Sequence, residues 1–135
     1  MPIEIPRTDV LLTLMGAPHT DDLVTTMLRL VQAMAARGGT VQVWACGYAT
    51  QLTQRSLGGT KPRNPVDWSV DYPSTAAVVE SLLDAFPDRL YWYGCRFCSD
   101  ERGAIDHLPR VALRAPAGYA QNVAAAAKTV LIGVI

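Results

Sequence analysis

The chain has 135 residues, half of them hydrophobic, and its 12 basic and 12 acidic side chains give a formal net charge of zero at pH 7. This size and apolar content fit one domain with a continuous core, and we expect residues 1–135 to form it. The charges do not gather in blocks, so the basic patch that attracts nucleic acid or an anionic membrane is missing. We therefore expect neither as a partner.

The N-terminus and the cysteines indicate the cellular compartment in which the protein is expected. Residues 1–7 lack the basic flank and apolar stretch of a signal peptide, and the apolar runs are too short to span a bilayer. Cys46, Cys95 and Cys98 form an odd, unevenly spaced set, unlike the disulfide framework of a secreted protein. We expect a cytoplasmic protein whose thiols are reduced.

The first third of the chain predicts a strand, a helix and a second strand. Residues 10–15 form a nearly continuous apolar run ending at Gly16, which is typical of a strand covered on both faces. Thr20 can cap a helix with an acidic first turn and an apolar stripe, which the glycine pair 38–39 ends. Residues 40–46 then predict the second strand and end at Cys46.

Residues 47–73 are too long for a plain connection, because links in α/β proteins usually have about 2 to 6 residues. A short helix over 50–57, ended by a glycine pair, is compatible with the pattern, and a proline-stiffened loop follows. The segment leaves the second strand at the edge where the cysteines are expected. A lid over them, a subunit contact through Trp68 and Tyr72, and a mobile surface loop all remain open.

The second half continues the alternation. Ser74 caps a predicted helix that Pro87 ends, and the remaining elements are a strand over 89–94, a short strand over 110–114, a helix over 119–127 and a strand over 129–135. Strands that alternate with helices predict right-handed crossovers and a parallel sheet with helices on both faces. We therefore expect a three-layer α/β sandwich with five parallel strands in the flavodoxin-like order 2-1-3-4-5.

This topology predicts where the reactive side chains meet. In such sheets ligands bind beyond the carboxyl ends of the strands, near the point where the strand order reverses, here between strands one and three. His19 follows the first strand, Cys46 ends the second, and Cys95 and Cys98 follow the third. We expect these four residues along one edge, although Cys46 also fits a packing role and His19 a solvated loop. His107 is interpreted as structural.

The segment 94–103 carries the clearest chemical signal. It follows the apolar run 90–93 directly and has the pattern of a helix start. Backbone N–H groups at a helix start favour a thiolate, the nucleophilic form of cysteine. Cys95 and Cys98, with Arg96 and Arg102 beside them, therefore predict a reactive thiol site.

On these residues the sequence resembles the DsrE/TusD-like family of sulfur-relay proteins over nearly its whole length. That family has a cysteine at the end of the third strand and an Arg-Gly pair a fixed distance beyond, which Cys95 and Arg102-Gly103 match. The resemblance implies that Cys95 carries sulfane sulfur as a persulfide between a donor and an acceptor, which are proteins or small thiols. It implies no cofactor and no metal, and a homo-oligomer, either a trimer or a hexamer.

The chain departs from the family pattern after Cys95. Relatives usually have small apolar residues where this chain has Cys98, Ser99, Asp100 and Glu101. The two acids oppose thiolate formation at Cys95, while Arg96 and Arg102 favour it. Cys98 also permits a second function, a thiol redox switch in which it resolves a persulfide or sulfenate on Cys95 as a disulfide.

Two further classes of protein share some of these features. Cys46, Cys95, Cys98 and His19 form a possible zinc ligand set, although their spacing matches no standard zinc finger. Cys-x-x-Cys beside βαβ units also occurs in thioredoxin-type oxidoreductases. Here, however, the pair follows the third predicted strand rather than the first, which disfavours that class.

Overall fold

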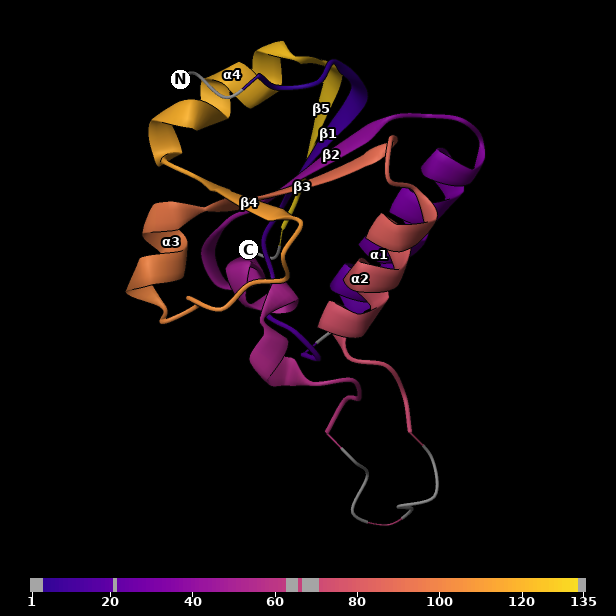
Figure 1. Ribbon diagram of the computed structural model, residues 1–135, viewed down its shortest axis with the longest axis vertical. Coiled ribbons are helices and arrows are strands. Elements are labelled where there is room, and N and C mark those ends of the chain that lie inside the picture. Colours follow the sequence, from indigo (N-terminus) through magenta and orange to yellow (C-terminus); the bar gives the residue numbers. More distant parts are fainter. Residues whose placement is uncertain (1–3, 21, 63–65, 67–70, 134–135) are drawn as a thin grey trace.

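A five-stranded parallel sheet with helices on both faces forms the protein in a computed structural model, which describes residues 4–20, 22–62, 66 and 71–133 (Figure 1). The fold class predicted from the sequence is thereby confirmed. The strands are β1 (Thr8–Leu14), β2 (Val41–Ala45), β3 (Leu90–Cys95), β4 (Val111–Arg114) and β5 (Ala126–Ile132). The α-helices are α1 (Asp22–Ala36), α2 (Thr75–Ala85), α3 (Arg96–Glu101) and α4 (Tyr119–Ala124), and the 3-10 helices are η1 (Gly47–Thr53), η2 (Arg55–Leu57) and η3 (Pro116–Gly118).

The strand order is β4-β3-β2-β1-β5, so the expected order 2-1-3-4-5 is wrong. The chain steps outward from β1 through β2 and β3 to β4, and then returns across the sheet so that β5 pairs with the free side of β1. Strand order depends on contacts between distant segments, which the apolar pattern of a single strand does not contain. In the observed order β2 and β3 are direct neighbours, with Ala45 opposite Gly94 in the register.

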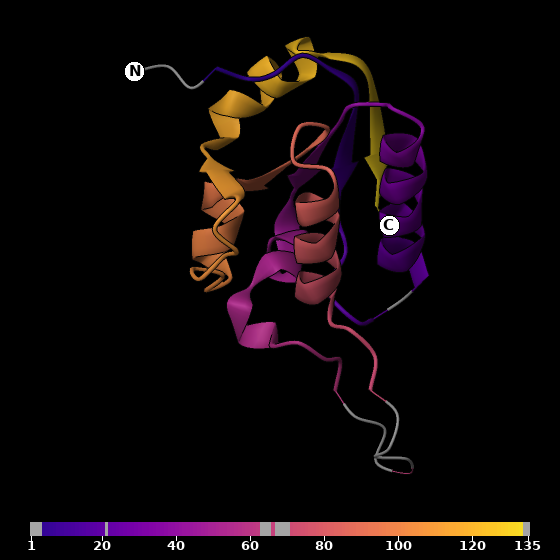
Figure 2. The same ribbon diagram turned by 45° about the vertical axis from the view of Figure 1, so that its right-hand side comes forward.

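Helices α1 and α2 cover one face of the sheet and enclose the main core (Figure 2). In α1 the buried residues recur at helical spacing, and in α2 the Ser74 hydroxyl accepts a hydrogen bond from the Ala77 N–H at 3.1 Å, as the sequence predicted for a cap. The hydroxyl of Thr20, the residue expected to cap α1, donates to the Ala17 carbonyl, and α1 begins at Asp22. The core includes Leu12, Met27, Val31, Val43, Val79 and Trp92.

Helices α3 and α4 lie on the opposite face (Figure 2). The ring of Tyr119 packs edge-on against Trp44 with their centroids 5.1 Å apart, and its hydroxyl shares a hydrogen bond with Thr13. Two fully buried amides also join α4 to the sheet, because Asn122 Nδ2 donates to Gln42 Oε1 at 2.9 Å. This face therefore holds α4 partly by polar contacts that satisfy each other.

The predicted helix over 50–57 is realised as η1 and η2, and Gly58 ends η2 with a positive φ of 67°. Beyond η2 the chain forms a two-stranded stem in which the Lys61 N–H donates to the Tyr72 carbonyl, and this stem projects away from the sheet (Figure 1). Trp68, which suggested a subunit contact, lies outside the described residues. Tyr72 is exposed.

The last helix ends earlier, and the last strand begins earlier, than the sequence indicates. Helix α4 ends at Ala124 and β5 starts at Ala126, because β1 pairs with β5 from Thr8 onward. Residues 134 and 135 of the expected last strand lie outside the described residues. None of the helices within the described part of the chain has the length and apolar content needed to cross a membrane.

Candidate functional site

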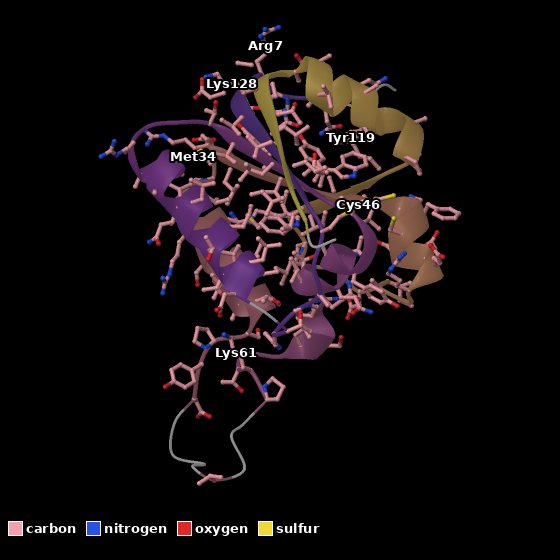
Figure 3. The ribbon with its side chains drawn as sticks, turned by 180° about the vertical axis from the view of Figure 1, so that it is seen from behind. Arg7, Met34, Cys46, Lys61, Tyr119 and Lys128 are labelled. Carbon is pink, nitrogen blue, oxygen red and sulfur yellow. The ribbon has the colours of Figure 1, made fainter. Side chains whose placement is uncertain are left out.

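The three cysteines converge at the carboxyl ends of β2 and β3. Cys46 follows β2, Cys95 is the last residue of β3, and Cys98 lies in the first turn of α3. The Sγ atoms of Cys46 and Cys98 are 4.0 Å apart, and the Cys95 thiol is close enough to Cys98 to affect its pKa. Figure 3 shows sulfur atoms together between the labelled Cys46 and α3. The predicted grouping of the cysteines is therefore observed, with Cys98 between the other two thiols.

Cys95 lies where β3 turns into α3. The strand before it packs closely against β4, because a Cβ atom on Gly94 would lie 2.9 Å from Leu113 Cδ2 and the Leu113 side chain would have to move. Cys95 itself has extended backbone angles and forms the N-cap of α3, and only 4% of its surface is exposed. The chain thus turns from strand to helix at the thiol, as the sequence predicted.

Cys98 has the lowest pKa of the three thiols. Its burial raises the pKa, but this effect is outweighed by the Gly47 N–H, by hydrogen bonds from the Cys95 and Cys46 side chains, and by the positive charge of Arg102. The pKa of Cys98 consequently lies below its ordinary value of 9.0. Cys98 is therefore the thiol that holds the largest share of thiolate near neutral pH.

The other two thiols are held in the protonated form. Burial, with a smaller effect from the neighbouring Cys98, raises the pKa of Cys46 to about 11. Burial also raises the pKa of Cys95, against the opposing effect of the Cys98 and Phe97 N–H groups at the start of α3. A thiolate on Cys98 thus has two thiol donors around it.

Arg102 is the arginine that acts on the cluster. Its guanidinium lies over the ring of Tyr48, 4.7 Å from the centroid, donates to the Cys98 carbonyl at 3.4 Å, and pairs with Glu101 at 3.0 Å. Its side chain is only 23% exposed, so its charge acts through a partly desolvated space. Arg96, the other predicted arginine, is exposed at the start of α3.

His107 joins α3 to η1, the two elements that border the thiols. Its Nδ1 lies 2.9 Å from Thr53 Oγ1 and 3.0 Å from Gln54 Nε2, and its Nε2 lies 3.2 Å from Ser99 Oγ. Burial lowers the pKa of His107, which favours the neutral ring that these contacts require. The structural role expected for this residue agrees with its contacts, and those contacts position the helix that carries Cys98.

His19 does not join the cysteines, contrary to the expectation from the sequence. Its Nε2 accepts a hydrogen bond from the Thr75 N–H at the start of α2, on the opposite face of the sheet from the thiols. The backbone of His19 has a φ of 63°, and burial lowers the pKa of its ring, with a smaller effect from Lys61. The expectation fails because the loop after β1 turns toward α2 rather than toward α3.

The zinc site that the sequence left as an alternative lacks its histidine ligand, because His19 contacts α2 and not the cysteines. Within residues 4–20, 22–62, 66 and 71–133, His, Cys, Asp and Glu side chains do not form a group of three or more that is placed to hold a metal ion. The cysteines are arranged instead so that each can share a proton with its neighbour. That geometry suits thiol exchange better than coordination.

Two functional contacts escaped the sequence analysis. Gly47 has a φ of 60°, and its N–H favours the thiolate of both Cys98 and Cys46. Tyr48 supplies the ring under Arg102. The available signal was the glycine directly after Cys46, because a positive φ at that position is unstrained only for glycine. The start of the long 47–73 segment therefore borders the site, although its later stem does not.

Comparison with known proteins supports the fold class. The sequence matches no protein-family profile and no curated protein. Among solved structures, the fold is similar to that of the YchN protein of E. coli. The TM-score is 0.69 at 22% sequence identity, over 92% of this chain and 98% of that one. At this identity the likeness concerns the fold.

Proposed function

We propose that this protein is a sulfur-relay protein that carries sulfane sulfur as a persulfide on Cys95. The observation that carries the proposal is the convergence of three thiols at the carboxyl ends of β2 and β3, around the cysteine that matches the DsrE/TusD-like family position. The fold similarity to YchN supports the same family resemblance.

The surroundings of Cys95 suit a carrier. The N–H groups of Cys98 and Phe97 face its sulfur and would stabilise the anionic outer sulfur of a persulfide. Its 4% exposure protects such a group from thiols in solution, whereas α3 presents Phe97, which is 63% exposed, beside the site. An exposed aromatic next to a buried reactive group suits docking of a donor or acceptor protein.

The test is brief exposure to inorganic polysulfide, immediate alkylation and peptide mapping. We expect Cys98→Ser to carry one additional sulfur atom on Cys95, and Cys46→Ser to do the same after brief exposure. Cys95→Ser should retain none, although two thiols of the cluster remain. Sulfur found only on Cys98 would show that the carrier residue is wrongly assigned, and the absence of any added sulfur in all variants would overturn the function.

A further inference from the structure

The cluster contains one more thiol than a carrier with a resolving cysteine needs. A persulfide on Cys95 requires one sulfur atom from the protein, and a disulfide that resolves it requires a second, Cys98. Cys46 comes from a different element, yet its Sγ lies 4.0 Å from that of Cys98. This contact brings a third sulfur atom next to Cys98, from a residue 52 positions away in sequence.

We infer that Cys46 and Cys98 form an internal reductant that discharges the Cys95 persulfide as hydrosulfide and ends as a Cys46–Cys98 disulfide. This inference rests on the proposed function. It adds an activity to the relay, namely the reduction of sulfane sulfur.

The first step is attack by the Cys98 thiolate on the inner sulfur of the Cys95 persulfide. A Cys95–Cys98 bond forms, the bond to the outer sulfur breaks, and that sulfur takes a proton from water and leaves with the electron pair as hydrosulfide. The Cys95 thiol, at the N-cap of α3, is close enough to the Cys98 thiol, in the first turn of that helix, for each to affect the pKa of the other. Cys98 suits this step because its environment favours the thiolate.

In the second step the Cys46 thiol attacks the Cys98 sulfur of that disulfide. A Cys46–Cys98 bond forms, the Cys95 sulfur leaves with the electron pair, and the proton of Cys46 passes to it, so that Cys95 is ready to accept another sulfur. Two thiols are oxidised to a disulfide and one sulfane sulfur is reduced to hydrosulfide, so the sum needs no external oxidant or reductant. A dithiol reductant then restores the pair.

The geometry favours this second exchange. A disulfide has a sulfur–sulfur distance of about 2.0 Å, so the Cys46 and Cys98 sulfur atoms need to approach by about 2 Å from their observed separation. Cys95 is the better leaving group, because the N–H groups of Cys98 and Phe97 oppose the rise in pKa that burial causes at Cys95, whereas the pKa of Cys46 is raised to about 11. Exchange therefore runs from the Cys95–Cys98 bond to the Cys46–Cys98 bond.

The test follows sulfur and disulfides after polysulfide has been removed by gel filtration, without reductant. In the wild type, sulfur on Cys95 should disappear while one hydrosulfide per chain is released and a Cys46–Cys98 peptide pair appears. Cys46→Ser should still release hydrosulfide but stop at a Cys95–Cys98 disulfide. Cys98→Ser should keep its persulfide at least about tenfold longer than the wild type and release no hydrosulfide. Cys46→Ala should stop at the same Cys95–Cys98 disulfide, and it introduces no buried hydroxyl.

The outcomes separate the two hypotheses. If the wild type stops at the Cys95–Cys98 disulfide, as Cys46→Ser does, Cys46 has no part in the reaction and the inference is wrong. The same holds if the wild type keeps its sulfur as long as Cys98→Ser does. In both cases the sulfur retained by Cys98→Ser still supports the carrier function. If Cys98→Ser takes up no sulfur at all, both the function and the inference fall.

Discussion

At the scale of single residues, the reactivity of the Cys98 thiol depends on the position of the Arg102 guanidinium. Arg102 lowers the pKa of Cys98 and is shared between Glu101, the ring of Tyr48 and the Cys98 carbonyl. A thiolate and a carboxylate thus compete for the same guanidinium. Removing the guanidinium should raise the pKa of Cys98, and removing the carboxylate should lower it.

Arg102→Gln should slow alkylation of Cys98 by iodoacetamide at pH 7.5, and Glu101→Gln should accelerate it. Each change should be less than about tenfold, because ion pairs near a surface contribute about 1 kcal/mol or less. Peptide mapping of alkylation rates between pH 6 and 10 measures the effect, with Arg96→Gln as a control for an exposed arginine. Equal rates in Arg102→Gln and Arg96→Gln would contradict the role assigned to Arg102.

At the scale of elements, α3 is held against η1 through His107, so the site is sensitive to the charge of that ring. Burial lowers the pKa of His107 in the folded protein below the ordinary value of 6.5, and burial does the same at His19. At a pH between the lowered pKa of the folded protein and the ordinary pKa of the unfolded chain, the unfolded chain binds more protons than the folded one. The stability contributed by the neutral rings is therefore fully present above about pH 6.5 and is lost as pH falls below it.

We expect the free energy of unfolding to fall between pH 7 and pH 5, and His107→Gln to show a smaller fall. At pH 7 this variant should be about 1–3 kcal/mol less stable than the wild type, because it loses hydrogen bonds to Thr53 and Ser99. Urea unfolding followed by tryptophan fluorescence measures both quantities, and His19→Gln provides the matched control for the second histidine. A wild type and a His107→Gln variant with the same pH dependence would show that His107 does not titrate with folding.

For the molecule as a whole, the open question is what covers its edge strand. Among the described residues, strand β5 pairs with a strand on one side only, and it exposes Val130 at 44% and Leu131 at 65%. Edge strands with exposed apolar side chains favour pairing with another chain. The cysteine site lies toward the other side of the sheet, at β2 and β3, so an assembly through β5 leaves the thiols free for a donor or acceptor.

We expect a homo-oligomer, either a trimer or a hexamer as the family resemblance implies, when light scattering is measured at micromolar concentration. Leu131→Lys should shift the mass toward the monomer, because it places a charge on the apolar edge. Leu30→Lys, on the exposed side of α1, should leave the mass unchanged. A monomeric wild type would refute the assembly without affecting the chemistry of the thiols.

Local patterns in the sequence determined the element types, the Ser74 cap and the cysteine at the turn from β3 into α3. These features depend on neighbouring residues, namely apolar runs, capping side chains and a glycine next to a strand end. The parallel sheet also followed, because alternating strands and helices allow few other arrangements. The sequence could therefore predict that Cys95 and Cys98 share a site.

Only the tertiary structure decided which distant segments meet. Cys46 reaches Cys98 because β2 and β3 are neighbours in the order β4-β3-β2-β1-β5, whereas the predicted order would have placed β1 between them. The same packing sends His19 to α2 and brings Gly47 and Arg102 to the thiols. Strand order and the paths of loops are set by the free energy of packing across the whole sheet, so no single stretch of the sequence encodes them.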